Sequence, residues 1–230
     1  SSDGTLKVWN LETKEELFTF NGHINSVNAV AFTPNGKQVI SASSDGTLKV
    51  WNLETKEELF TFNGHINSVN AVAVTSNGQQ VISASDDDTL KVWNLETKEE
   101  LFTFNGHIYL VNAVVVTPNG QQVISASSDN TLKVWNLATG EELFALNGHS
   151  KSINAVAITS NGQQVISASD DNTLKVWNLE TREIITTFTG DSYICCCAVA
   201  PDGTAIVAGD SSGRVHFLRL EGMREESREK

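Results

Sequence analysis

Serine, histidine and aspartate, the three residue types of a hydrolase triad, recur together in this sequence at a fixed spacing. Gly-His pairs begin at residues 22, 64, 106 and 148, so the period is 42 residues, and the first copy of the trio is His23, Ser41 and Asp45. Nucleophilic catalysis is therefore one interpretation. An active site is usually a single constellation, whereas this trio occurs four times. None of the four serines lies in a nucleophile-elbow motif, so we expect a structural role.

The histidines also raise the question of a metal site. Each repeat holds one histidine, without a second His or Cys at ligand spacing, so we expect neither a metal nor a cofactor. The three cysteines are consecutive, Cys195–Cys197, and cannot form a disulfide framework. They favour a reducing, cytoplasmic setting, and we expect them to be buried, unreactive thiols.

The composition narrows the classes of partner. The chain has 230 residues, of which 40% are hydrophobic, and a net charge of −12. Bulk negative charge repels phosphate backbones, so we expect no nucleic-acid partner. The sequence has neither an apolar run of the roughly 20 residues that a membrane helix needs nor a signal-peptide pattern at its start, so we expect no membrane partner.

The elements that position the trio read as strands. Within residues 22–63, four β-type runs are predicted at Val27–Phe32, Lys37–Ala42, Thr47–Asn52 and Leu59–Phe62. Turn-forming segments separate them at residues 33–36, 43–46 and 53–57. Each unit is therefore a four-stranded antiparallel meander. It cannot bury both of its faces alone, and stacking of neighbouring units buries them.

At this point a family resemblance is clear. The Gly-His start, the Ser-x-x-x-Asp turn, the tryptophan ending the third strand and the 42-residue period resemble the WD40-repeat β-propellers. The resemblance implies an all-β propeller of four-stranded antiparallel blades, with about five and a half blades visible here and about seven in a longer parent. One departure is that the family's Trp-Asp pair is Trp-Asn here, as at Trp51-Asn52.

In this family a Trp, a Ser, a His and an Asp of each blade form a buried hydrogen-bond relay. Carried over position by position, the four relays are His23, Ser41, Asp45, Trp51; His65, Ser83, Asp87, Trp93; His107, Ser125, Asp129, Trp135; and His149, Ser167, Asp171, Trp177. An imidazole can bridge a carboxylate and a hydroxyl, and the hydroxyl can accept the indole N–H. We expect the relays to hold the loops of each blade to its strands.

The repeats divide the chain. We expect a propeller over residues 1–220, made of a partial blade (1–21), repeats 22–63, 64–105, 106–147 and 148–189, and a degenerate terminal repeat (190–220), followed by a charged tail over 221–230. In the terminal repeat the relay positions become Asp191, Ala208, Ser212 and Leu218. The chain opens in the middle of a repeat, so we expect a fragment that forms an open arc with exposed edges.

The near-identical copies differ in two loops. One varies after the Gly-His pair and the other just before the turn aspartate; in the family, both loops lie on one rim face where ligands dock. The sequence thus predicts partner contacts at Tyr109, Leu110, Lys151, Tyr193, Asp86, Asp170, Ser26 and Ser68, with Tyr109, Leu110 and Tyr193 as anchors and the charged residues setting charge preference. Neutral drift on exposed loops is the alternative.

We therefore expect a non-catalytic scaffold or ligand-sensing domain that binds a protein or peptide. The array, with its degenerate final unit, also resembles C-terminal domains of bacterial, cyanobacterial-type multidomain signalling proteins. A structural repeat that closes into a ring by homo-oligomerisation through its open edges is the alternative. A hydrolase that uses one of the Ser/His/Asp sets is the third hypothesis.

Overall fold

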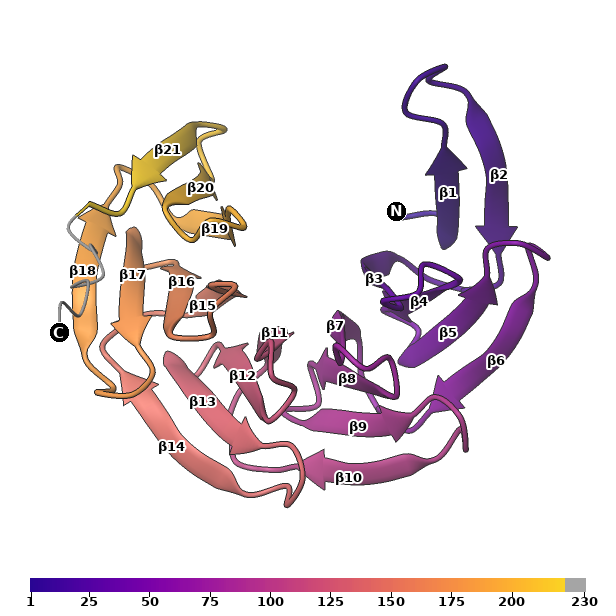
Figure 1. Cartoon of the computed structure of the whole chain (residues 1–230), viewed down its shortest axis with the longest axis horizontal. Coiled ribbons are helices and arrows are strands. Elements are labelled where there is room, and N and C mark those ends of the chain that lie inside the picture. Colours follow the sequence, from indigo (N-terminus) through magenta and orange to yellow (C-terminus); the bar gives the residue numbers. More distant parts are fainter. Residues whose placement is uncertain (222–230) are drawn as a thin grey trace, which may run out of the picture.

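The computed structural model of the chain describes residues 1–221. These residues form β-strands in six antiparallel sheets and contain no helix, hence none that could cross a membrane. Figure 1 shows the sheets arranged radially in an open arc, with the first strand of each four-stranded sheet innermost and the fourth outermost. The prediction of four-stranded antiparallel meanders is confirmed.

The four complete sheets follow the repeats in order. Their strands are β3 (Val27–Phe32), β4 (Gln38–Ser43), β5 (Thr47–Asn52) and β6 (Glu58–Asn63); β7 (Val69–Val74), β8 (Gln80–Ser85), β9 (Leu90–Asn94) and β10 (Glu100–Phe104); β11 (Val111–Val116), β12 (Gln122–Ser127), β13 (Thr131–Asn136) and β14 (Glu142–Asn147); β15 (Ile153–Ile158), β16 (Gln164–Ser169), β17 (Thr173–Asn178) and β18 (Ile184–Thr189). The sheets at the two ends are smaller: β1 (Thr5–Trp9) and β2 (Glu16–Asn21); β19 (Ile194–Val199), β20 (Ala205–Asp210) and β21 (Val215–Arg219). The predicted strand ends differ from these by about one residue.

The Trp-Asn pair has a clear use at the end of the third strand. The side-chain oxygen of Asn52 accepts the backbone N–H groups of Glu54 and Thr55, at 2.8 and 3.0 Å. This bond starts the turn to the fourth strand, in which Lys56 takes a positive φ of 62°. An aspartate would offer the same acceptor, so replacing the family's Asp with Asn keeps the turn.

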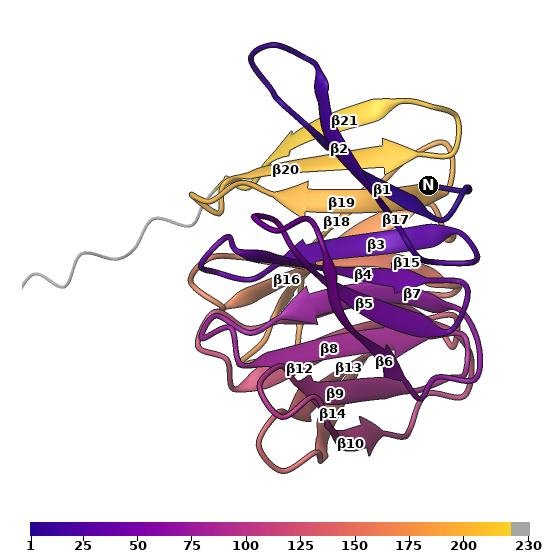
Figure 2. The ribbon, with the colours of Figure 1, turned by 90° about the vertical axis from the view of Figure 1, so that its right-hand side faces the viewer.

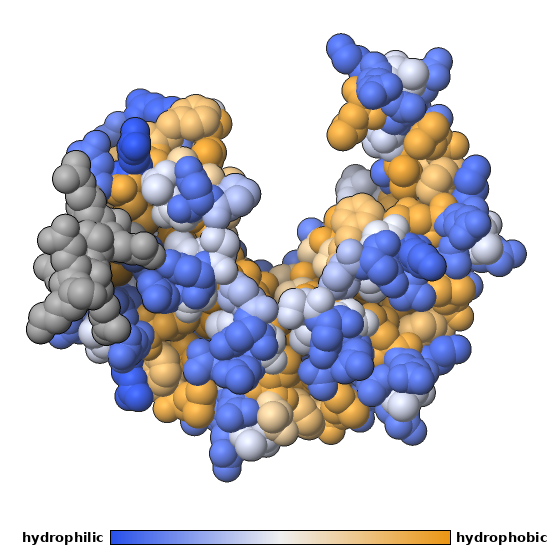
Figure 3. Space-filling view, in the orientation of Figure 1, coloured by the Kyte–Doolittle hydropathy of each residue, from blue (hydrophilic) through white to orange (hydrophobic). Residues whose placement is uncertain are grey.

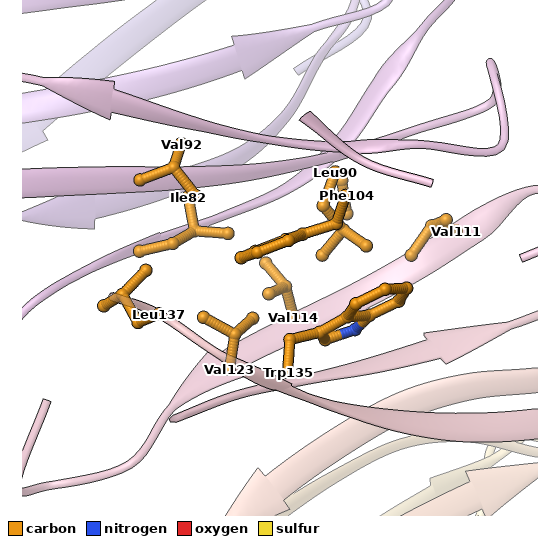
Figure 4. Packing of buried hydrophobic residues seen from close by; sticks show 10 residues of the cluster. Ile82, Leu90, Val92, Phe104, Val111, Val114, Val123, Trp135 and Leu137 are labelled. Atoms are coloured by element: carbon orange, nitrogen blue, oxygen red, sulfur yellow. The ribbon is translucent and has the colours of Figure 1, made fainter. Parts of the chain in front are cut away.

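The hydrophobic core lies between the sheets. In Figure 4, Phe104 and the apolar side chains of Ile82, Leu90 and Val92 meet those of the next sheet, among them Val111, Val114, Val123 and Trp135. The rings of Phe104 and Trp135 stack with centroids 5.1 Å apart. Burying each such side chain stabilises the fold by about 1.5–3 kcal/mol. A single meander is therefore stable only when neighbouring sheets bury its two faces.

The strands run between the two faces of the disc, as the side view in Figure 2 shows, so the connecting loops gather on these faces. The loops before each first strand and the turns between second and third strands share one face, because hydrogen bonds join them, for example from Ile24 N to Asp45. We call this face the rim face. The segments between third and fourth strands lie on the opposite face.

The two ends of the arc leave apolar surface uncovered, as Figure 3 shows. Phe217 on β21 is 80% exposed, whereas Val50 at the equivalent place in the first complete blade is fully buried. At the other end, a cavity of about 380 Å³ lies beside β1 and β3, and Val30 and Phe32 are exposed there. Of the charged tail predicted over 221–230, only Glu221 falls among the described residues.

Candidate functional site

The structure brings the four members of each predicted relay together. In the first complete blade, His23 lies in the loop before β3 and Ser41 lies on β4. His23 Nδ1 is 2.8 Å from Asp45 Oδ2, and its Nε2 is 2.7 Å from Ser41 Oγ. The Trp51 indole N–H donates to the same Ser41 Oγ at 2.8 Å.

The other complete blades repeat this geometry. The histidine Nε2 to serine Oγ distance is 2.7 Å in each, and the tryptophan Nε1 to serine Oγ distance is 2.8–2.9 Å. The sets are His65, Ser83, Asp87 and Trp93; His107, Ser125, Asp129 and Trp135; His149, Ser167, Asp171 and Trp177.

The environment sets the protonation of the relay. Burial lowers the pKa of His23 below its ordinary value of 6.5, so the imidazole is neutral near pH 7. Burial works to raise the pKa of Asp45, but hydrogen bonds from Thr47 and His23 outweigh it and hold that pKa below 3.8. Nδ1–H therefore donates to the carboxylate, Nε2 accepts the Ser41 hydroxyl, and the hydroxyl oxygen accepts the Trp51 indole.

This order of contacts is also that of a hydrolase triad, but the surroundings differ. Ser41 is 0% exposed, and its oxygen already accepts the Trp51 N–H. A substrate carbonyl has no path to this oxygen, so the hydroxyl cannot act as a nucleophile. The relay instead ties the rim-face loop and the β4–β5 turn to the sheet, and all its buried polar atoms have partners.

The terminal blade replaces the relay with a different pair. The four relay positions carry Asp191, Ala208, Ser212 and Leu218 in this blade. These residues include neither a histidine nor a tryptophan, so they cannot form the relay. Asp210 Oδ2 instead bonds His216 Nε2 at 2.9 Å, and the His216 ring packs on Phe188. Hydrogen bonds from Ser212 and His216 lower the pKa of Asp210 well below its usual range.

Sequence reasoning missed this pair. The available signal was His216 itself, the one histidine that does not follow the 42-residue period.

Sequence reasoning also missed a motif in the terminal blade. Residues 209–213, Gly-Asp-Ser-Ser-Gly, have the spacing of a nucleophile elbow. In the structure they form the hairpin turn between β20 and β21. Ser211, at the nucleophile position of the motif, is exposed and donates its backbone N–H to Tyr193 O, whereas His216 bonds Asp210. An elbow needs a strand-to-helix turn and a serine facing a base, so the geometry does not support a hydrolase here.

The expectation that all three cysteines are buried was wrong. Cys195 and Cys196 are exposed, because no sheet formed by residues 1–221 covers the outward face of the terminal blade. Cys197 points back towards the preceding blade, with its Sγ 3.8 Å from Ile166 O, and burial raises its pKa to about 12. Among residues 1–221, no group of three or more His, Cys, Asp or Glu side chains is placed to hold a metal ion.

The predicted anchors lie on the rim face and are accessible. Tyr109 is 60% exposed, Leu110 41% and Tyr193 48%. Lys151 places its Nζ 5.2 Å from the centre of the Tyr193 ring. Three further exposed side chains lie in the same loops but are not among the predicted contacts: Ile24, Ile66 and Ile108. Isoleucine is common to the first three complete copies, and the fourth has Ser150 at this position.

Of the two predicted serines, Ser68 takes part in a contact between blades. Asn28 Nδ2, at the start of β3, lies within hydrogen-bond distance of Ser44 Oγ, Ser68 Oγ and Val69 O of the next blade, at 2.9, 3.0 and 2.9 Å. The two serine hydroxyls also bond each other at 3.1 Å. We call this arrangement a serine junction; Asn112, Ser128 and Ser152 form a second one. Ser26 is half-buried in the loop before β3.

The other two junctions use a carboxylate. Asn70 Nδ2 donates to Asp86 Oδ1 at 2.6 Å and to Val111 O at 3.1 Å, and Asn154 bonds Asp170 in the same way at 2.7 Å. We call these aspartate junctions. The residue of the next blade that would be the second serine is Leu110 in one and Tyr193 in the other. The aspartate carboxylate accepts the asparagine N–H that the two serine hydroxyls accept in a serine junction. The position of the second serine can therefore carry an exposed apolar side chain.

Comparison with known proteins agrees with this geometry. The family described as "WD domain, G-beta repeat" matches residues 14–52, 56–94 and 98–136, and the TEP-1 C-terminal beta-propeller family matches residues 149–220. The Lissencephaly-1 homolog of Caenorhabditis briggsae is 42% identical over 43 residues, which are 19% of this chain. The match spans only 11% of that relative's length. With its repeated blades and relays, the chain belongs to the WD40-repeat family of β-propellers.

Proposed function

We propose that this chain is a non-catalytic scaffold or ligand-sensing domain that binds a protein or peptide through its rim face. WD40 propellers generally serve as interaction scaffolds, and the finer assignment of the rim face is our own. The observation that carries it is the exposure of Tyr109, Leu110 and Tyr193 on otherwise near-identical loops. Large apolar side chains exposed in loops are the type that supplies most binding energy at protein interfaces.

The framework leaves these side chains free to evolve. The relay atoms are engaged within each blade and the junction asparagines bond the next blade as well, so changing either set disturbs folding. Tyr109, by contrast, lends only its backbone carbonyl to the fold, where it accepts the Ser127 hydroxyl at 2.9 Å. Its ring is available to a partner.

Affinity capture from cells that naturally express the protein tests the proposal. We expect a variant with Tyr109→Ser, Leu110→Ser and Tyr193→Ser to lose specific partners. The matched control is Leu11→Ser, because Leu11 is a fully accessible apolar residue in the β1–β2 connection on the opposite face. Equal capture by the rim variant and the native chain, with unchanged thermal stability, would rule the rim face out.

Self-association is a second candidate function. Phe217 and Val215 at one end of the arc, and Phe32 and Val30 at the other, are exposed at positions whose equivalents within the arc are covered by neighbouring sheets. Two copies could cover these faces and bury apolar area on the scale of other blade contacts. Light scattering after size exclusion over a range of concentrations decides this. A mass that rises with concentration and falls back in Phe217→Ser supports it, and a constant monomer mass contradicts it.

We also propose a reducing, cytoplasmic setting. It is supported by the three free thiols, two of which are exposed.

A further inference from the structure

One aspartate junction has a lysine of this chain beside its exposed side chain. At the junction between β15–β18 and β19–β21, Lys151 extends over the ring of Tyr193, with Nζ 5.2 Å from the ring centre. Asp170 of the same junction accepts a hydrogen bond from Asn154. A cation thus rests on an exposed apolar side chain at a junction that also supplies a carboxylate, a favourable arrangement for both charge and stem.

The other aspartate junction, between β7–β10 and β11–β14, has the same carboxylate, an aliphatic side chain in place of the aromatic ring, and an asparagine in place of the lysine. Asp86 corresponds to Asp170, Leu110 corresponds to Tyr193, and Asn67 occupies the place of Lys151. The Asn67 side chain turns back to the Asp86 carbonyl at 3.4 Å. No lysine or arginine among residues 1–221 forms an ion pair with Asp86.

We propose that this second junction binds a lysine or arginine side chain of a partner polypeptide, a site we call the Asp86 site. The aliphatic stem lies on Leu110, which is 41% exposed, and the charge faces the half-buried Asp86 carboxylate. The net charge of −12 draws a basic segment towards the chain. The inference rests on the proposed function and names the partner's chemistry at one place on the rim face.

The serine junctions serve as internal controls. Ser44 and Ser68 satisfy Asn28 with neutral hydroxyls that bond each other. They offer no carboxylate, and they present no large apolar side chain to carry an aliphatic stem. We therefore expect no cation binding at either serine junction.

The experiment is a titration of the isotope-labelled chain, followed by NMR, with the short peptide acetyl-Ala-Arg-Ala-amide. The uncharged peptide acetyl-Ala-norleucine-Ala-amide is the reference. We expect the arginine peptide to shift the Leu110 methyl signals and the Asn70 side-chain amide signals in a saturable way. The norleucine peptide should shift them at least several-fold less.

Two variants test the site from opposite directions. Asp86→Asn removes the charge but keeps an oxygen that can accept from Asn70, so the fold is retained and the shifts disappear. Asn67→Lys places a lysine of the chain itself at the site, in the position that Lys151 has at the other junction. The added arginine peptide should then no longer shift the signals; Asn67→Gln is the uncharged control. In Lys151→Ala, new shifts should appear at Tyr193.

Unchanged shifts in Asp86→Asn would overturn the proposal, as would equal shifts with the norleucine peptide. These results leave the proposed function standing if the rim variant still loses its partners in affinity capture. If the rim variant keeps all partners while the peptide binds as expected, the wider function fails and the Asp86 site remains.

Discussion

Replacing Ser83 with alanine removes the atom on which one relay depends. Ser83 Oγ accepts the Trp93 indole N–H at 2.9 Å and bonds His65 Nε2 at 2.7 Å. Ser83 is fully buried, and His65 and Trp93 are nearly so. After the substitution the indole N–H and the imidazole nitrogen have neither the hydroxyl nor free access to water. The change in volume is a single oxygen atom, so packing contributes little.

The expected magnitude follows from those two atoms. A buried polar group left without a partner costs about 1–3 kcal/mol, so with two such groups the free energy of unfolding should fall by roughly 2–6 kcal/mol. For a chain of this size, each kcal/mol lowers the melting temperature by about 2–4 °C, which gives a decrease of roughly 4–24 °C. Because the relay geometry recurs, Ser125→Ala in the next blade should give a similar loss.

Urea unfolding followed by tryptophan fluorescence and circular dichroism measures this loss. Ser76→Ala, in an exposed turn, is the control and should change stability by less than about 0.5 kcal/mol. Ala208→Ser places a hydroxyl at the equivalent buried position of the terminal blade, where the relay tryptophan is Leu218, so it should not stabilise. A loss below about 0.5 kcal/mol in Ser83→Ala, at an unchanged denaturant slope, would refute the structural role of the relay.

Three further predictions concern acid, thiols and glycine. Burial lowers the pKa of His149 below 6.5, and Asp171 has a pKa of about 2 because hydrogen bonds from Thr173 and its neighbours outweigh burial. The unfolded chain therefore binds more protons than the folded chain below about pH 6.5, through His149, and again between about pH 4 and 2, through Asp171. The free energy of unfolding measured with urea should fall as the pH drops through each range, and a profile independent of pH would contradict this. In the Cys195–Cys197 run, the first two thiols should react with a thiol reagent in the folded chain, and the third only after unfolding, as peptide mass spectrometry can show. Gly64→Ala would bring a Cβ within 2.9 Å of the Trp93 ring, so we expect urea unfolding to show a loss of about 1–3 kcal/mol, and an unchanged midpoint would disagree.

The blades could be predicted from the sequence because apolar and polar residues alternate along each strand and turn-forming residues separate the strands. The third strand, Thr47–Asn52, agrees to the residue, since Gly46 has a φ of 83° and Asn52 accepts from the next turn. Errors of one residue at Gln38–Ser43 arise where the strand continues into the turn, and no residue type marks that end.

The contacts between blades could not be predicted in this way. Asp86 and Leu110 vary together, but the reason is Asn70, a constant residue that reaches across to the Val111 carbonyl of the next blade. The sequence shows which positions differ, whereas only the packed blades show that Asp86 replaces a pair of hydroxyls. The exposure of Cys196 likewise depends on which face of the terminal blade has a neighbour.

The central claim is that partners bind the rim face while the relays only support it. A photo-crosslinking amino acid at position 109, compared with the same amino acid at position 55 on the opposite face, tests it most directly in cells that naturally express the protein. Thr55 lies in the β5–β6 connection, and both positions are exposed to solvent. We predict discrete crosslinked polypeptides from position 109 and none of these from position 55. The same products from both positions, or products from position 55 alone, would contradict the account.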